Sequence, residues 1–331
     1  MRAIVLDQQH TIDESPLQVR DVPFPEPGPN QIRVKVHCCA VCHTDLHVVE
    51  GDLPPHKLPV VPGHQIVGTV EKCGREVTRF QRADRVGIPW LHRTDRTCEY
   101  CRQGLENLCE HAEFTGYDVD GGFAEFTLVD EDFAYPIPPQ FTDENAAPLL
   151  CAGIIGYRSY LLSGSQPGER LGLYGFGASA HIVIQFARHL GREVYVFTRS
   201  ENHRKHAEAL GAAWTGRAED PTPKPLDAAI IFAPAGGLVP EALRATRKGG
   251  TVACAGIVMS QIPPMDYSLL YHERILRSVA NSTRQDARDF LKLAAQVPIR
   301  TEVQIYDLND TNRALHDLKH SRITGAAVVQ I

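Results

Sequence analysis

The spacing of apolar positions changes near residue 170 and divides the chain into two parts. Before it, short alternating runs typical of strands occur at 31–40, 66–71 and 123–129, separated by dense proline and glycine. After it, apolar strands alternate with segments of helical periodicity, a pattern that predicts an α/β fold with a parallel doubly wound sheet. The expected strands are 171–174, 194–198, 228–232 and 251–255, the expected helices 178–190 and 202–210, and two further helical patterns and a closing strand at 326–331 follow residue 284.

Length and charge narrow the class of protein. A chain of 331 residues suggests two domains, each able to bury its own core. The net charge is -6 and no long basic run occurs, so we expect no nucleic-acid partner. No apolar run reaches the roughly 20 residues of a membrane span, so we expect no membrane association. Nine cysteines, an odd number, suggest reduced thiols and metal ligands in the cytoplasm rather than a disulfide framework.

A glycine-rich turn lies between an expected strand and an expected helix. Gly175 allows a tight turn, Gly177 lets backbone N–H groups approach a pyrophosphate, and small Ala180 permits close packing of helix on strand. A plain strand-to-helix turn would use the same residues, but the surrounding alternation of strands and helices favours a dinucleotide site.

The end of the next strand bears on which dinucleotide binds. Thr198 stands where an NAD site usually has an acid, and Arg199 could pair with a 2′-phosphate. Arg199 could instead stack on adenine or point to solvent, and Glu201 could still serve an NAD site. Because no acid stands at the end of this strand and Arg199 follows it, the sequence favours NADP(H) over NAD(H).

Four metal-ligand residues gather in a short segment without proline: Asp95, Cys98, Cys101 and Cys109. Close cysteine spacing lets one loop surround a structural zinc ion, with a carboxylate as an acceptable fourth ligand. The alternative is a loop with three ordinary thiols. A nucleic-acid zinc ribbon is disfavoured, because the neighbours Glu99, Glu106 and Glu110 are acidic.

A second set is dispersed along the chain: Cys42, His64 and Cys151. Two cysteines and one histidine with an open fourth position form a known catalytic zinc set. Spacing alone does not connect residues about a hundred positions apart, and single cysteines and histidines more often have structural roles.

Taken together and in order, these motifs resemble the zinc-containing alcohol dehydrogenases of the medium-chain dehydrogenase/reductase superfamily. The resemblance covers nearly the whole chain and rests on 42–47, Pro62–Gly63–His64–Gln65, the 95–109 segment, 151–153 and 175–180. It implies a GroES-like β-barrel catalytic domain at 1–152 and 285–331, and a Rossmann dinucleotide-binding domain at 153–284.

The resemblance also implies roles for single residues. Cys42, His64 and Cys151 would bind the catalytic zinc, and Asp45 would orient the histidine ligand. Thr44 would take the alcohol proton and His47 would pass it to solvent, although His47 could also be an exposed helix residue without a role. His43 would approach the cofactor pyrophosphate.

Three departures from the family pattern affect these expectations. Gln65 stands where the family usually has Glu, so we expect slower exchange of water for alcohol at the metal. Asp95 replaces the first of four cysteines, which should make that zinc more sensitive to acid. The family's cofactor-contacting Arg near the C-terminus is missing, because the chain reads Thr324–Gly325–Ala326.

The expected activity is zinc-dependent hydride transfer between a nicotinamide dinucleotide and a small-molecule alcohol/aldehyde or ketone pair. Zinc-free quinone and enoyl reductases are disfavoured by the Cys42–His64–Cys151 set. The alternatives left open are a polyol or amino-alcohol dehydrogenase, or a non-catalytic zinc- and dinucleotide-binding protein. The resemblance further implies a homodimer or homotetramer.

Overall fold

The computed structural model describes all residues, 1–331, and they form two compact units. The first unit comprises 1–154, 281–295 and 300–331, and the second comprises 155–280 and 296–299. Helix α4 (Ala152–Ser163) begins in the first unit and continues into the second. No helix combines the length and the apolar character needed to cross a membrane.

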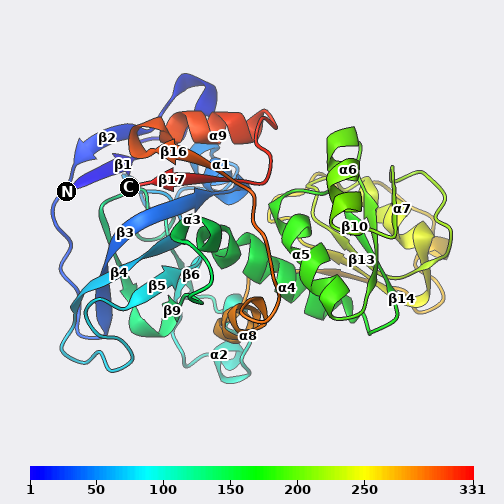
Figure 1. Ribbon diagram of the computed structural model, residues 1–331, viewed down its shortest axis with the longest axis horizontal. Helices are drawn as coiled ribbons and strands as arrows, with labels where there is room; N and C mark the ends of the chain where they lie inside the picture. The colour runs from blue at the N-terminus through cyan, green and yellow to red at the C-terminus, as the bar shows by residue number, and fades with distance from the viewer. The chain divides into compact units, whose positions relative to one another are not determined.

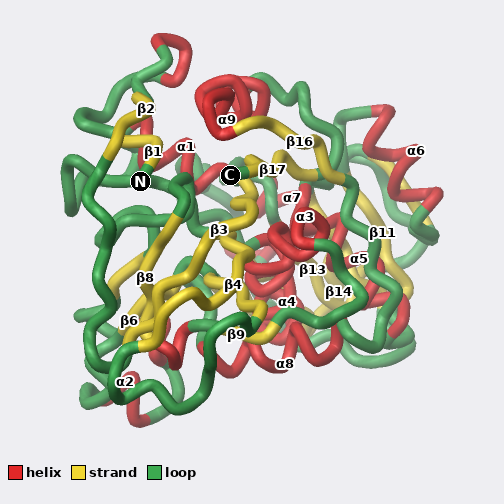
Figure 2. Tube along the Cα trace, turned by 60° about the vertical axis from the view of Figure 1, so that its left-hand side comes forward, coloured by secondary structure: helices red, strands yellow, loops and turns green.

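The first unit is built on a seven-stranded, mainly antiparallel sheet. Its path runs β16-β17-β3-β4-β5-β9, and β8 pairs with the first half of β3, so that β3, β4 and β8 lie side by side (Figure 2). The C-terminal strand β17 pairs with β3 through Val329 and Cys39, as expected for a barrel completed by the C-terminal segment. The strands of this unit are β1 (Arg2–Val5), β2 (Gln18–Asp21), β3 (Gln31–Val41), β4 (Gln65–Cys73), β5 (Arg85–Ile88), β6 (Leu91–Arg93), β7 (Glu113–Phe114), β8 (Phe126–Asp130), β9 (Tyr135–Pro136), β16 (Val303–Asp307) and β17 (Ala326–Gln330).

Helical segments connect these strands, and α9 packs on β17, β16 and β3. The C-terminal helix α9, in red, lies beside the blue N-terminal segment (Figure 1). The helical segments of this unit are η1 (Ile12–Glu14), α1 (His43–Glu50), α2 (Glu99–Arg102), η2 (Glu106–Leu108), η3 (Glu131–Phe133), α3 (Asp143–Ala146), η4 (Ala147–Leu150), α8 (Arg284–Ala294), η6 (Leu308–Asp310) and α9 (Thr311–Lys319).

The second unit is a six-stranded parallel sheet of order β12-β11-β10-β13-β14-β15. In chain order this is 3-2-1-4-5-6, the doubly wound arrangement with a switch point between its first and fourth strands. Helices α5 and α7 flank the sheet on opposite sides (Figure 1). The elements are β10 (Arg170–Tyr174), α5 (Ala178–His189), β11 (Glu193–Phe197), α6 (Glu201–Ala209), β12 (Trp214–Gly216), β13 (Leu226–Ile231), α7 (Leu238–Ala245), β14 (Thr246–Cys254), η5 (Tyr267–Leu269) and β15 (Ile275–Ser278).

Each unit has its own apolar core. In the first, β3 is buried along almost its whole length, so its alternation is weaker than that of a strand with one solvated face. In the second, the rings of Tyr174 and Phe197 stack on adjacent strands with centroids 4.0 Å apart, and neither is more than 2% exposed. The expected mixed α/β architecture is therefore confirmed.

Two strands differ from the sequence expectation by three or more residues at one end. The run 123–129 contributes to β8 only from Phe126, because the Phe123 backbone bonds Ile4 and Pro62 instead, and Ala124 bridges to Ala3. Strand β14 starts at Thr246, five residues before the expected start. Its first residues include the polar Arg247 and Lys248, so they show no apolar pattern that would predict a strand. Both differences arise from tertiary pairing.

Candidate functional site

Three side chains far apart in sequence converge in the first unit. The Sγ atom of Cys42 lies 3.3 Å from Nε2 of His64 and 4.0 Å from Sγ of Cys151. Around a tetrahedral zinc ion, these pairs of atoms would be separated by about 3.6 and about 3.8 Å, given usual Zn–N and Zn–S lengths. The donor set therefore fits a zinc ion and leaves one coordination position open.

The pairing of two strands brings Cys42 and His64 together. Ala40 near the end of β3 pairs with Gln65 at the start of β4, so the two ligands lie at the same end of the sheet. Gly63, just before the histidine, has φ +98, and a Cβ there would meet Cys39 and Phe123 at 3.0 Å. The Pro62–Gly63 turn thus depends on glycine for its close approach.

Asp45 connects two of the candidate ligands. One carboxylate oxygen lies 2.8 Å from Nδ1 of His64, and the other accepts the backbone N–H of Cys42 at 2.8 Å. Asp45 and His64 are 2% and 0% exposed, so this bond is formed away from water. A carboxylate bound to Nδ1 fixes the ring so that Nε2 faces the two sulfurs, as second-layer partners of metal-binding histidines do.

The electrostatics of the cluster favour a cation. Burial by itself lowers the pKa of His64, but the charges of Asp45 and Cys42 outweigh it and raise the pKa to about 10. The hydrogen bond from the Cys151 thiol, helped by His64, holds the pKa of the Cys42 thiol well below its usual range. The same bond raises the pKa of Cys151. A divalent ion would thus replace the protons that His64 and Cys151 hold beside the Cys42 thiolate.

Trp90 packs directly on the candidate ligand His64. The two rings meet edge to face at 4.8 Å, and Trp90 also stacks on Phe114 at 5.2 Å and on Tyr117 at 5.8 Å. Only 8% of Trp90 is exposed. These contacts show a buried ring that restrains His64.

Helix α1 begins at the metal cluster. Its N-cap is Cys42, whose Sγ accepts the Thr44 N–H at 3.3 Å, so Thr44 adjoins the cluster through its backbone. One turn later, Nδ1 of His47 lies 2.7 Å from a carboxylate oxygen of Asp52, and the His47 side chain is only 14% exposed. His47 is therefore not a freely exposed helix residue. His43, the first residue of α1, is exposed.

Asp52 is a functional candidate that the sequence analysis missed. Gly51 ends α1 in a left-handed conformation with φ +88 and turns the chain so that Asp52 meets His47. A glycine C-cap followed by an acid, four and five residues after a histidine, is a signal that could have been recognised.

The four ligand atoms of Asp95, Cys98, Cys101 and Cys109 lie within 4.8 Å of one another. The Asp95 carboxylate accepts the backbone N–H groups of Cys98 and Thr97 at 2.9 and 2.8 Å, and these bonds hold its pKa well below the usual range. A fixed, ionised carboxylate beside three sulfurs fits a closed tetrahedral zinc site.

The glycine turn occupies the expected place in the second unit, directly after β10. Gly175 has φ +88, and a Cβ there would lie 2.9 Å from the Ala233 backbone beyond β13. Gly177 is the N-cap of α5, and Ala180 is completely buried. The turn therefore lies at the switch point between β10 and β13, where doubly wound sheets bind dinucleotides.

The end of β11 is followed by a basic residue, Arg199, and then by an acid, Glu201. Arg199 is exposed and directly follows Thr198, whose N–H bonds the Gly216 carbonyl. Glu201, the acid that could have served an NAD site, forms an ion pair with Arg204.

Comparison with known proteins agrees with this geometry. Residues 28–139 match the family described as "Alcohol dehydrogenase GroES-like domain", and residues 180–296 match "Zinc-binding dehydrogenase". The chain is 51% identical to "Probable alcohol dehydrogenase AdhA" of Mycobacterium tuberculosis over 97% of this chain and 94% of that protein.

Two further relatives cover essentially the whole chain. An alcohol dehydrogenase of Geobacillus stearothermophilus is 33% identical over 100% of both chains. A cinnamyl alcohol dehydrogenase of Sorghum bicolor has a similar structure, with a TM-score of 0.90 and 26% identity over 99% of this chain and 97% of that one. The similarity thus extends through both units.

Proposed function

Because this chain belongs to the zinc-containing alcohol dehydrogenases and is a zinc-dependent alcohol oxidoreductase, we propose that Cys42, His64 and Cys151 hold its catalytic zinc. The observation that carries the proposal is the convergence of three ligand atoms around an open position, with Asp45 orienting the histidine. Zinc bound there supplies Lewis acidity at the substrate oxygen. The relatives favour an alcohol dehydrogenase over a polyol or amino-alcohol dehydrogenase and over a non-catalytic protein.

The proton of the alcohol needs a path to solvent, and α1 provides candidates for it. We propose that the Thr44 hydroxyl accepts this proton and that His47 passes it on. The bond between Nδ1 of His47 and Asp52 supports this role, because it leaves Nε2 to exchange the proton and compensates positive charge on the ring.

Replacing His47 with Gln should slow alcohol oxidation more at low pH than at high pH. At high pH, water and hydroxide can take the proton without the imidazole, so the loss should shrink toward pH 9 from about 10²-fold near pH 6. Asp52→Asn should change the profile in the same direction by a smaller factor. The measurement is kcat/KM for a short alcohol as a function of pH.

The control for this pH profile is His10→Gln, which removes an exposed histidine that pairs with Glu14 outside the cluster. It should leave the profile unchanged. A loss that is equal at every pH in His47→Gln would rule out the relay.

We further propose that the nicotinamide cofactor is NADP(H), bound at Gly175, Gly177 and Ala180 with His43 toward its pyrophosphate. Exposed Arg199 beside Thr198 supports a 2′-phosphate contact, and Glu201 is paired with Arg204. Guanidinium binds phosphate oxygens in a paired geometry that a ribose hydroxyl does not need.

Arg199→Ala should lower kcat/KM for NADPH by about 10–100-fold, the usual worth of a hydrogen bond to a charged group. The value for NADH should change little. Steady-state kinetics with both cofactors measures the ratio, and Arg244→Ala, an exposed arginine on α7, serves as the control. Equal losses with both cofactors would contradict a 2′-phosphate contact.

We propose a second, structural zinc on Asp95, Cys98, Cys101 and Cys109, supported by their converging ligand atoms. All nine cysteines are free, which supports the predicted cytoplasmic location.

Gln65 is buried and neutral, so it cannot balance the charge of the catalytic metal as the family's usual Glu would. Slower exchange of water for alcohol at the metal therefore stays a prediction.

We also propose the domain division 1–152 with 285–331 and 153–284, supported by the two compact units.

We further propose a homo-oligomeric assembly. Strand β15 is an edge of the parallel sheet, and Ile275 on it is 51% exposed. Tyr267 and Tyr271 nearby in sequence are 71% and 55% exposed. An edge strand with free backbone groups and exposed apolar side chains nearby favours pairing with a second copy.

A further inference from the structure

A cluster of metal-binding side chains in the first unit has no part in the proposed active site. It consists of Asp13 in η1 and of His316 and His320, which lie on α9 and at its C-cap. Their ligand atoms lie within 4.8 Å of one another. We propose that these three residues bind a divalent transition-metal ion, which would be a third metal site of this chain.

The helix supplies two of the three ligands by its own geometry. Residues four apart lie on the same face of a helix, so His316 and His320 project to the same side. Their ring centroids are 4.5 Å apart. A pair of imidazoles in this arrangement is a preformed bidentate donor that needs only a third ligand from outside the helix.

Asp13 supplies that third ligand from the other end of the chain. Its Oδ1 atom lies 3.1 Å from Nε2 of His320 and 3.7 Å from Nε2 of His316. Ligand atoms about 2.0–2.1 Å from a tetrahedral ion are separated by about 3.3 Å, which lies between the two observed distances. Both imidazoles thus present the same nitrogen to the same oxygen, with room for an ion after small side-chain shifts.

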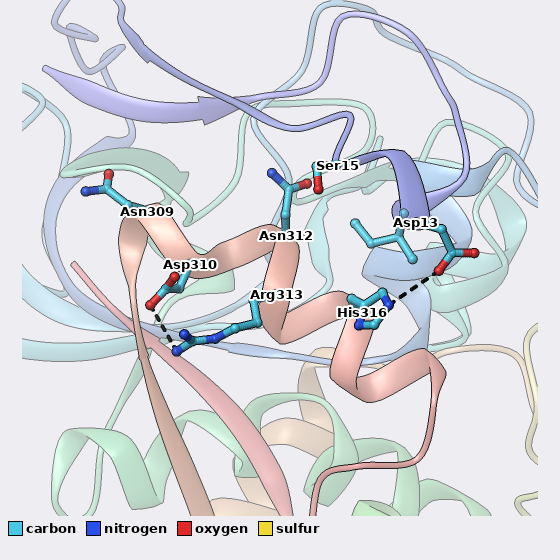
Figure 3. A pocket seen from close by; sticks show the side chains of 8 residues that line it. Asp13, Ser15, Asn309, Asp310, Asn312, Arg313 and His316 are labelled. Atoms are coloured by element: carbon cyan, nitrogen blue, oxygen red, sulfur yellow. Dashed lines mark ion pairs between the residues drawn. The ribbon is translucent and has the colours of Figure 1, made fainter.

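The donor set indicates the kind of ion. Two imidazoles and one carboxylate suit Ni²⁺, Cu²⁺ and Zn²⁺, whereas Mg²⁺ and Ca²⁺ prefer oxygen ligands only. A hollow lined by Asn309, Asn312 and Arg313 opens beside His316 (Figure 3), and it leaves space for water as the remaining ligand. Arg313 is paired with Asp310 and so is directed away from the cluster in Figure 3.

A neighbouring lysine limits the affinity of the site. The Lys319 ammonium lies 2.6 Å from Oδ2 of Asp13 and 3.0 Å from Glu50. It therefore occupies the carboxylate oxygen opposite the imidazoles and leaves Oδ1 to the metal. A positive charge so close should weaken cation binding, so we expect an exchangeable ion rather than a permanent one.

The bound ion would connect η1 near the N-terminus with α9 near the C-terminus. Because only the folded chain brings Asp13 to the two histidines, binding must stabilise the native state. This predicts a higher melting temperature with added metal, independent of catalysis.

Nickel titration of the untagged, zinc-loaded enzyme at pH 7.5 tests the proposal, with bound nickel and retained zinc both counted by elemental analysis. The wild-type chain should bind one Ni²⁺ without losing zinc and should melt at a higher temperature. His316→Ala and His320→Ala should each weaken binding by at least about tenfold, and Asp13→Asn should weaken it less. Lys319→Met should strengthen it.

His56→Ala is the matched control. His56 is exposed and paired with Asp118 at 2.7 Å, but it belongs to no cluster of metal-binding side chains. It should bind nickel as the wild type does, and every variant in this set should keep its zinc. The proposal is overturned if the wild type binds no additional nickel. It is also overturned if either histidine variant on α9 binds nickel like the wild type, or if His56→Ala loses it equally.

Discussion

His64→Ala should release one zinc per chain and lower kcat/KM for a short alcohol by at least about a thousandfold. The expected loss is large because removing even one group that stabilises a developing oxyanion costs about 10²–10³-fold, and here the Lewis acid itself departs. The remaining Cys42 and Cys151 offer only two ligands, too few for a catalytic zinc site. Metal content after gel filtration and steady-state kinetics are the two measurements.

The zinc count separates this explanation from simple misfolding. The ion at Asp95, Cys98, Cys101 and Cys109 should remain, so the content should fall from two to one. His92→Ala is the matched control, because His92 is also a buried histidine, 3% exposed, and burial lowers its pKa to about 4. That variant should keep both ions. Unchanged zinc and activity in His64→Ala would disprove the proposed centre.

Thr44→Val should lower kcat for alcohol oxidation by about 10²–10⁴-fold, the range for loss of a positioned proton-transfer group. Valine has nearly the same shape but no hydroxyl. The Thr44 backbone N–H that bonds Cys42 is kept, so zinc content should not change. Single-turnover kinetics with a short alcohol would show whether the chemical step is the one that slows.

Thr44→Ser provides the control, since it restores a hydroxyl at the same position. Its rate should return to within about tenfold of the wild type. If Thr44→Val oxidises alcohol within a few-fold of the wild-type rate, the proton does not pass through this hydroxyl.

Four of the six strands of the second unit were predicted because their pattern is local, whereas the short edge strands β12 and β15 were not predicted. Alternation of apolar strands with amphipathic helices appears within windows of about 15 residues, the range over which periodicity is informative. The turn at Gly175 also depends on adjacent residues, namely the end of β10 and the start of α5. The first unit was less distinct, because β3 is buried on both faces and segments such as 123–124 pair outside the regular sheet.

In the candidate site, the contrast between features that local sequence predicts and features that depend on distant residues is clearer. The sequence alone grouped Cys98, Cys101 and Cys109, since fifteen residues of chain can surround one ion, and it named Gly175 and Gly177. For Cys42, His64 and Cys151 it offered suitable chemistry, and only the family resemblance linked them. Asp52 and Asp13 were not identified, because the sequence around each aspartate does not indicate that it contacts His47 or His316.

The sequence by itself therefore determined the elements and motifs whose residues lie within one turn or one loop. Covalent geometry limits the distances between such residues. The tertiary structure alone decided which distant groups meet. Strand pairing carries His64 to Cys42, and packing of η4 on β3 and β4 brings Cys151 to them, although Cys42 and Cys151 are 109 positions apart. Packing of α9 carries His320 to Asp13 across 307 positions. Such meetings depend on burial and pairing summed over a whole unit, which no short window of sequence contains.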